Sequence, residues 1–88
     1  MHGAPDIVFE ILSPSTANYD LSVKKESYEK YGVREYWIVD PIERSIELFV
    51  SVNGKFESRF VGSEGDVNST LLPGFSIKAE EVFPRVSF

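Results

Sequence analysis

Glu10 lies in the middle of a short apolar run, and no other feature of the sequence limits the possible folds as strongly. The run extends from Ile7 to Leu12 and is typical of a strand that is buried on both faces. An unpaired ionised carboxylate in such a strand is costly, so it is usually paired with a cation, bound to a metal or protonated. We therefore expect another part of the chain to supply a partner for Glu10.

The segment at 20–31 is predicted to be a helix that packs over this strand. Asp20 suits the N-cap position, and Gly32 suits the position that follows the last helical residue. At about 100° per residue, one leucine and two tyrosines share a stripe of the helix that also contains Lys24. The apolar members of this stripe are Leu21, Tyr28 and Tyr31. The stripe predicts a lysine that points towards the sheet.

Glu10 and Lys24 are thus predicted to meet where the helix packs on the strand, and two interpretations fit this pair. In the first, the two residues form a structural ion pair, or Lys24 extends its ammonium to water while its stem packs. In the second, an acid and a lysine aimed at one spot hold a divalent cation and polarise a water beside a phosphate.

A second apolar run, from Glu35 to Asp40, completes a strand–helix–strand unit. A helix of about eleven residues between two strands is typical of a parallel pair with a right-handed crossover. In this arrangement Glu10 and the first half of the helix share the carboxyl end of the first strand. Parallel sheets usually bind their ligands at that end.

The rest of the chain is predicted to form an antiparallel meander. Partial alternation predicts a strand at 45–51, and Asn53-Gly54 is a strong hairpin signal before another strand at 55–61. We expect 62–68 to be a solvated loop rather than a calcium site, and 79–83 to be a short amphipathic turn that closes the core. The fold class is therefore α/β (α+β), a mixed sheet with a β-α-β unit followed by an antiparallel meander.

The composition predicts a single domain at 1–88 and limits its partners. The chain has no cysteine, and none of its apolar runs approaches the ~20 residues of a membrane span. We therefore expect a cytoplasmic protein without a membrane partner. A net charge of −5 argues against a simple DNA-binding module. It argues less against an enzyme that reaches phosphate through a metal, because the metal needs acidic ligands.

Four further residues have two interpretations each. Asp20 either caps the helix or orients Lys24, which lies four residues later. Three aromatic residues either stack on nucleic-acid bases or, as is more common on buried elements, fill the core. These are Tyr28, Tyr36 and Trp37.

Four ordered blocks of the sequence combine into a specific pattern. They are PDIVFEILSPST at 5–16, Asp20, Lys24 and Tyr28 at four-residue steps, GVREYWIVDP at 32–41, and LPGFSI at 72–77. Together they resemble the Uma-type family of restriction endonucleases, which belongs to the PD-(D/E)xK nuclease superfamily. The match covers nearly the whole chain and corresponds to the C-terminal half of a typical member. The resemblance implies a partial restriction-endonuclease-like core that lacks its N-terminal strands.

The resemblance also implies a metal-dependent phosphodiesterase site. In the superfamily pattern, an acid on one strand, and an acid and a lysine two residues apart on the next strand, bind Mg²⁺ (or Mn²⁺) and orient the attacking water. Glu10 matches the acid of the second strand, as a metal ligand and catalytic residue. The lysine is expected at residue 12, which is a leucine here. The family supplies its lysine from the helix instead, which makes Lys24 the second catalytic candidate.

Asp6 is a secondary candidate for a metal ligand. The family's first metal-binding aspartate is expected upstream of this sequence, whereas Asp6 belongs to a second Pro-Asp pair. Asp6 precedes Glu10 by four residues, which is roughly 13 Å along a strand and too far for both carboxylates to hold one ion without a bend. A structural role at the entry of the strand is the other interpretation of Asp6. We expect binding of Mg²⁺ (or Mn²⁺) to be weak or absent in this chain.

These features predict a metal-dependent endonuclease that hydrolyses phosphodiester bonds in DNA and is inactive or incomplete as this chain alone. The alternative is a non-catalytic oligomeric interaction module with a decayed nuclease fold, in which Glu10 and Lys24 are only a structural pair. We also expect a homodimer, because the strand at 7–12 would keep an uncovered apolar edge.

Overall fold

The computed structural model describes residues 5–12 and 21–82, and within these ranges the chain forms six strands and two helices. In chain order they are β1 (Ile7–Ile11), α1 (Leu21–Tyr31), β2 (Glu35–Asp40), β3 (Ser45–Val52), β4 (Lys55–Gly62), β5 (Asp66–Asn68), β6 (Ser76–Lys78) and α2 (Ala79–Val82). Neither helix in the described part of the chain is both long and apolar enough to cross a membrane. Asp20, predicted as a cap, and residue 83 of the closing turn lie outside the described residues.

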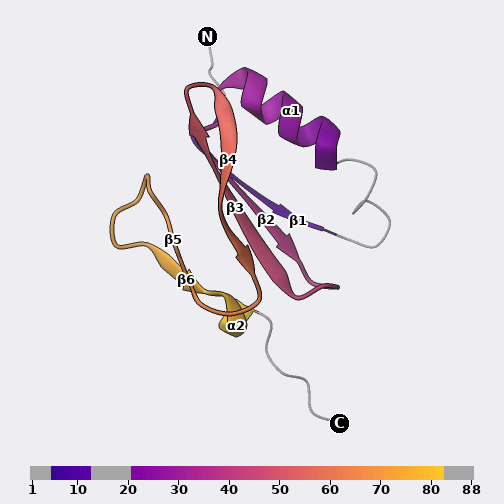
Figure 1. Cartoon of the computed structure of the whole chain (residues 1–88), viewed down its shortest axis with the longest axis vertical. Helices are drawn as coiled ribbons and strands as arrows, with labels where there is room; N and C mark the ends of the chain where they lie inside the picture. Colours follow the sequence, from indigo (N-terminus) through magenta and orange to yellow (C-terminus); the bar gives the residue numbers. More distant parts are fainter. Residues whose placement is uncertain (1–4, 13–20, 83–88) are drawn as a thin grey trace.

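A mixed sheet of four strands in the order β1-β2-β3-β4 is the centre of the fold (Figure 1). β1 and β2 are parallel, with Val8 opposite Tyr36 and Glu10 opposite Ile38. β2, β3 and β4 follow as an antiparallel meander. The predicted β-α-β unit and meander are therefore confirmed. The β3–β4 turn holds Asn53 and Gly54 at φ 54° and 82°, the left-handed backbone that this hairpin sequence favours.

Each face of the sheet carries its own apolar cluster, because alternate residues of β2 point to opposite sides. Tyr36 and Ile38 belong to the cluster under α1, whereas Trp37 belongs to the cluster under β5, β6 and α2. Figure 1 accordingly shows α1 and the β5–β6 pair on different sides of the sheet. The buried members under α1 are Leu12, Val33, Tyr36, Ile38, Phe49 and Phe56. Those on the other face are Trp37, Ile46, Leu48, Val67 and Ala79.

The prediction of a loop over residues 62–68 is wrong at its C-terminal end. Asp66–Asn68 forms β5, which pairs antiparallel with β6 through Val67 opposite Ile77. Val67 is buried, and it packs on the sheet face that also carries Trp37. A three-residue strand is too short to show the alternation on which a sequence prediction depends, so only the tertiary contact identifies it.

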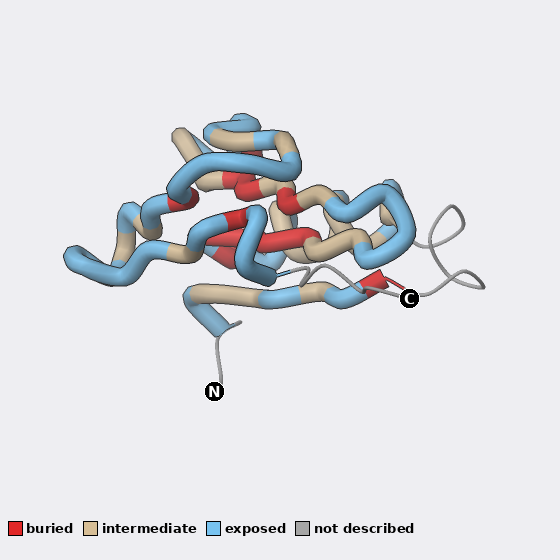
Figure 2. Tube along the Cα trace, turned by 90° about the horizontal axis from the view of Figure 1, so that it is seen from below, coloured by how far each residue is buried: buried red, intermediate tan, exposed pale blue. Residues whose placement is uncertain are grey.

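The prediction that β1 is buried on both faces is also wrong for the chain as it stands. Phe9 and Ile11 are 50% and 70% exposed, because β1 is an edge strand of the sheet. Figure 2 shows β1 as intermediate or exposed along its length. Leu12, the next residue, is buried. The exposed apolar edge that was expected for this strand is therefore present in the structure.

The apolar stripe predicted for α1 is correct for Leu21 and Tyr28 and wrong for Tyr31, which is 66% exposed. At about 100° per residue, the face that contacts the sheet is centred between Tyr28 and Lys25, and Tyr31 lies at its margin. A side-chain contact from α1 to the meander helps to fix this orientation. The carboxylate of Glu29 accepts a hydrogen bond from the backbone N–H of Phe56 at 2.6 Å.

Candidate functional site

Glu10 and Lys24 meet on the face of the sheet that α1 covers. The ammonium of Lys24 donates a hydrogen bond to Oε2 of Glu10 at a distance of 3.0 Å. The Lys24 side chain is 38% exposed and the Glu10 side chain is 21% exposed, so the pair is half-buried and open to solvent on one side. The predicted approach of these two residues is confirmed, and their assignment as catalytic residues stays a prediction.

Lys25, the next residue of the helix, has a different partner. Its ammonium lies 4.6 Å from the centroid of the Phe49 ring, a cation–π contact on the same face of the sheet. Two adjacent lysines of α1 therefore lie over the sheet, one against a carboxylate and one against an aromatic ring. Of these two lysines, Lys24 is the one that contacts an acidic group among the described residues.

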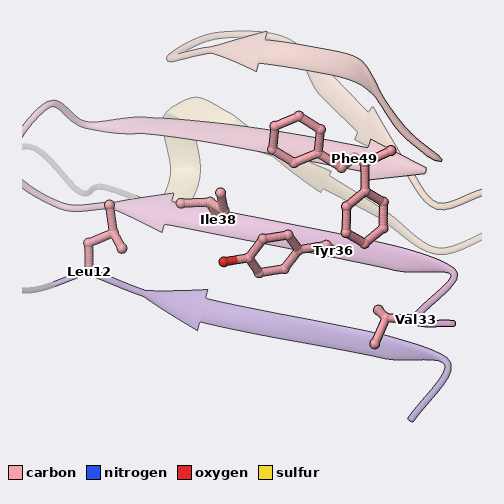
Figure 3. Packing of buried hydrophobic residues seen from close by; sticks show 6 residues of the cluster. Leu12, Val33, Tyr36, Ile38 and Phe49 are labelled. Atoms are coloured by element: carbon pink, nitrogen blue, oxygen red, sulfur yellow. The ribbon is translucent and has the colours of Figure 1, made fainter. Parts of the chain in front are cut away.

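Tyr36 lies on the strand next to Glu10, and its side chain is on the same face of the sheet. Its side chain is fully buried, and within the described part of the chain its hydroxyl has no hydrogen-bond partner. Burial and then the negative charge of Glu10 raise the pKa of Tyr36 above its ordinary value. The hydroxyl is therefore protonated at neutral pH, and it is available as a hydrogen-bond donor. Figure 3 shows it pointing along β2 towards the carboxyl ends of β1 and β2.

The described residues do not supply a complete set of ligands for Mg²⁺. Asp6 is exposed before the start of β1, and its carbonyl accepts hydrogen bonds from the backbone N–H groups of Arg34 and Glu35. Within residues 5–12 and 21–82, no group of three histidine, cysteine, aspartate or glutamate side chains is close enough to hold a metal ion. One carboxylate, that of Glu10, is poor ligation for a cation that prefers six oxygen ligands.

Glu35 is the buried carboxylate that the sequence analysis missed. Although its side chain is fully buried, five donors satisfy it. They are Trp37 Nε1 at 2.8 Å, Ser69 Oγ at 2.9 Å, the Thr70 N–H at 2.7 Å, Thr70 Oγ1 at 2.9 Å and the Leu71 N–H at 3.1 Å. This carboxylate joins β2 to the segment at 69–71, between β5 and β6. Because its acceptor sites are already used, Glu35 is a structural group and not a ligand site.

The pH dependence of stability tests this account of Glu35. Burial acts to raise the pKa of Glu35, but the hydrogen bonds from Trp37, Leu71, Ser69 and Thr70 outweigh burial and lower it below 4.5. A carboxyl whose pKa is lower in the folded state contributes stability above its unfolded pKa and loses that contribution as the pH falls through the folded value. We expect the urea midpoint to fall as the pH is lowered below about 4.5, and this acid-induced part of the loss to be absent in Glu35→Gln. An identical pH profile for the variant would contradict the assignment.

The aromatic candidates for base stacking are part of the core. Trp37 is fully buried and contacts Phe9 and Phe75 at ring-centroid distances of 5.3 Å and 6.0 Å. Tyr28 packs edge-on against Tyr36 at 5.0 Å. The core interpretation of these residues is therefore confirmed.

The chain is similar to known proteins along most of its length. The sequence model of the Uma2 family, described as "Putative restriction endonuclease", matches residues 1–80. Among solved structures, one similar chain is "a putative nuclease belonging to DUF820" from Anabaena variabilis ATCC 29413, with a TM-score of 0.73 and 22% sequence identity. The match covers 93% of this chain but 45% of that one, so this chain spans less than half the length of its structural neighbour. No curated protein matches the sequence.

Proposed function

This chain belongs to the Uma2 family, whose model is described as "Putative restriction endonuclease", and from this premise we propose that it carries part of a nuclease site that hydrolyses phosphodiester bonds in DNA. The single observation that supports this proposal best is the half-buried contact between Glu10 and Lys24 at 3.0 Å. It joins the two residues that the family pattern assigns to catalysis, although they lie on different elements.

The roles that we propose follow from charge and position. The Lys24 side chain is partly exposed, so its ammonium can reach a phosphate oxygen. There it can stabilise the negative charge that develops when a water attacks phosphorus. Glu10 holds this ammonium in place in the free protein. Glu10 is also the residue that we propose as a ligand of Mg²⁺ or Mn²⁺, with the remaining ligands supplied from outside the described residues.

The first test of the proposal is the genomic sequence before Met1. An in-frame segment that contains a Pro-Asp after a strand pattern supports a nuclease in which such a segment supplies the missing aspartate. A stop codon or an unrelated gene directly upstream would contradict the proposal, since the chain could then not complete the site in this way.

Metal binding by the 88-residue chain is expected to be weak. We predict a dissociation constant for Mg²⁺ above about 1 mM, because one carboxylate that is already paired with a lysine replaces few of the ion's hydration waters. Isothermal titration calorimetry with Mg²⁺ and Mn²⁺ measures this constant. Line broadening by Mn²⁺ in nuclear magnetic resonance spectra locates the ion.

The matched variants are Glu10→Gln and Glu57→Gln, since Glu57 lies opposite Val50, on the face of the sheet that α1 does not cover, and pairs with Arg59. Broadening around Glu10 is expected in the parent protein and in Glu57→Gln, and it is expected to disappear in Glu10→Gln. A micromolar dissociation constant, or broadening that persists in Glu10→Gln, would show that this account of the ligands is wrong.

We also propose that the chain forms a homodimer through the open edge of β1. No described strand lies beyond β1, and its side chains Phe9 and Ile11 remain largely exposed. An apolar edge strand without a lysine or an interior proline is a template for pairing with another chain.

Sedimentation equilibrium at micromolar concentration is expected to give twice the 10.0 kDa mass of the chain. Ile11→Lys places a charge on this edge and is expected to give a monomer. Val61→Lys is the control, because Val61 is 68% exposed on β4 at the other edge of the sheet. A mass of 10.0 kDa over the whole concentration range would contradict the dimer.

A further inference from the structure

The hydroxyl of Tyr36 is a buried polar group that the proposed roles of Glu10 and Lys24 do not use. Within the described part of the chain this hydroxyl has no hydrogen-bond partner, although the Tyr36 ring that bears it is closely packed. The rings of Tyr28, Phe49 and Phe56 lie 5.0 Å, 6.1 Å and 5.8 Å from the Tyr36 ring, measured between centroids. A phenylalanine would make the same ring contacts without the cost of an unpaired buried hydroxyl.

The position of this hydroxyl indicates what it serves. Tyr36 lies opposite Val8 on the neighbouring strand, and Ile38 lies opposite Glu10, so Glu10 is two residues further along the strands. The hydroxyl points in that direction, towards the carboxyl ends of β1 and β2 (Figure 3). The charge of Glu10 is close enough to act on the phenol. Glu10 is thus a carboxylate that lies further along the strands in the direction of this donor.

We propose that Tyr36 is a positioning residue for Glu10, whose hydroxyl donates a hydrogen bond to the Glu10 carboxylate when a phosphate oxygen draws the Lys24 ammonium away. The phosphate in this proposal rests on the proposed function. The role of the Tyr36 hydroxyl as donor rests on the geometry of the free protein. In the free protein Lys24 occupies Oε2 of Glu10 at 3.0 Å, and the Tyr36 hydroxyl has no partner. When Lys24 turns to the phosphate, the half-buried Glu10 carboxylate loses the ammonium as its partner. The Tyr36 hydroxyl then takes the place of the ammonium as hydrogen-bond donor.

This exchange explains why an unpaired hydroxyl is kept in a core of aromatic rings. It keeps Glu10 hydrogen-bonded in both states, so the carboxylate holds its position while Lys24 moves. The acceptor and the donor lie on adjacent parallel strands of one sheet, on the same face.

A double-mutant cycle on thermal stability tests the exchange without any assay of activity. Lys24→Met removes the ammonium and keeps most of the stem, and it stands for the state in which Lys24 has left Glu10. Tyr36→Phe removes one oxygen. In the parent background we expect Tyr36→Phe to leave the melting temperature unchanged or raise it, because the hydroxyl has no partner to lose. In the Lys24→Met background we expect the same change to lower it by about 4–8 °C.

If Tyr36→Phe changed the melting temperature in the same direction in both backgrounds, the proposal would be overturned. The hydroxyl would then have gained no partner from the loss of the ammonium. A lower melting temperature in the parent background would also overturn it, because the hydroxyl would already be bonded in the free protein. Both results are independent of whether the protein cleaves DNA, so a failure of the proposed nuclease function is detected separately, by the plasmid assay described in the Discussion.

A spectroscopic measurement tests the role of phosphate, with inorganic phosphate as the probe. The ¹³C resonance of Tyr36 Cζ reports hydrogen bonding by the phenol. We expect millimolar phosphate to shift it in the parent protein and to have no effect in Lys24→Met. Tyr31, which is 66% exposed on the same helix as Lys24, is the control and should keep its resonance. A Tyr36 resonance that does not move in the parent protein would overturn the exchange.

Discussion

Glu35→Gln is expected to destabilise the protein by about 2–4 kcal/mol, which is a large part of the roughly 4–13 kcal/mol typical of a domain of this size. The carboxylate of Glu35 is fully buried and accepts hydrogen bonds from five donors on Trp37 and the segment at 69–71. An amide group replaces one acceptor oxygen by a donor, so at least one buried donor loses its acceptor. Thermal unfolding followed by circular dichroism is expected to show a melting temperature lower by at least about 8 °C.

Glu57→Gln is the matched control for this change. The Glu57 side chain is 55% exposed and pairs with Arg59 at 3.4 Å on the surface of β4. Exposed pairs of this kind contribute at most about 1 kcal/mol, so the melting temperature should hardly change. Equal stabilities of the two variants would mean that the hydrogen bonds of Glu35 do not stabilise the fold as the structure indicates.

Lys24→Met is expected to reduce nuclease activity by at least about 100-fold, the usual effect of removing one group that stabilises the transition-state charge. The assay is Mg²⁺-dependent nicking of supercoiled plasmid DNA by the chain expressed with any in-frame coding sequence that precedes Met1. Glu10→Gln is expected to abolish activity in the same assay. The 88-residue chain alone should show no activity above background, since no group of three possible metal ligands is found within the described residues.

Lys25→Met provides an internal control for the position of the charge. Lys25 is adjacent to Lys24 but lies over the ring of Phe49, so its loss removes the same charge without changing the partner of Glu10. We expect it to retain most of the activity. A full rate in Lys24→Met, or cleavage by the 88-residue chain that Glu10→Ala abolishes, would contradict the proposed division of the site.

The contact between Glu10 and Lys24 could be predicted because each half has a local signal. A carboxylate in the middle of an apolar run needs a partner, whatever the fold. A lysine in the apolar stripe of a helix must lie near the sheet that the stripe covers. The strand–helix–strand order then brings the two elements together, so the pair follows from short-range pattern and from the handedness of the crossover.

The hydrogen bonds of Glu35 could not be predicted in this way. Its partners at 69–71 lie 34 to 36 residues further along the chain, and they are serine, threonine and backbone groups that occur in any loop. The short strands β5 and β6 are similar, because Val67 and Ile77 become recognisable as strand residues only through their contacts with the sheet. No local pattern indicates which loop will cover a given face.

The sequence by itself determined the elements that obey a period, their order and the acid–lysine pair, because these depend on the spacing of neighbouring residues. Tertiary structure alone decided which face each element presents and what remains uncovered. It left Tyr31 in solvent at the end of α1, and it exposed the side chains of Phe9 and Ile11. The physical reason is that burial depends on neighbours distant in the chain. A residue's apolar character indicates that it can be buried, but only the surrounding fold determines whether a partner is there to bury it.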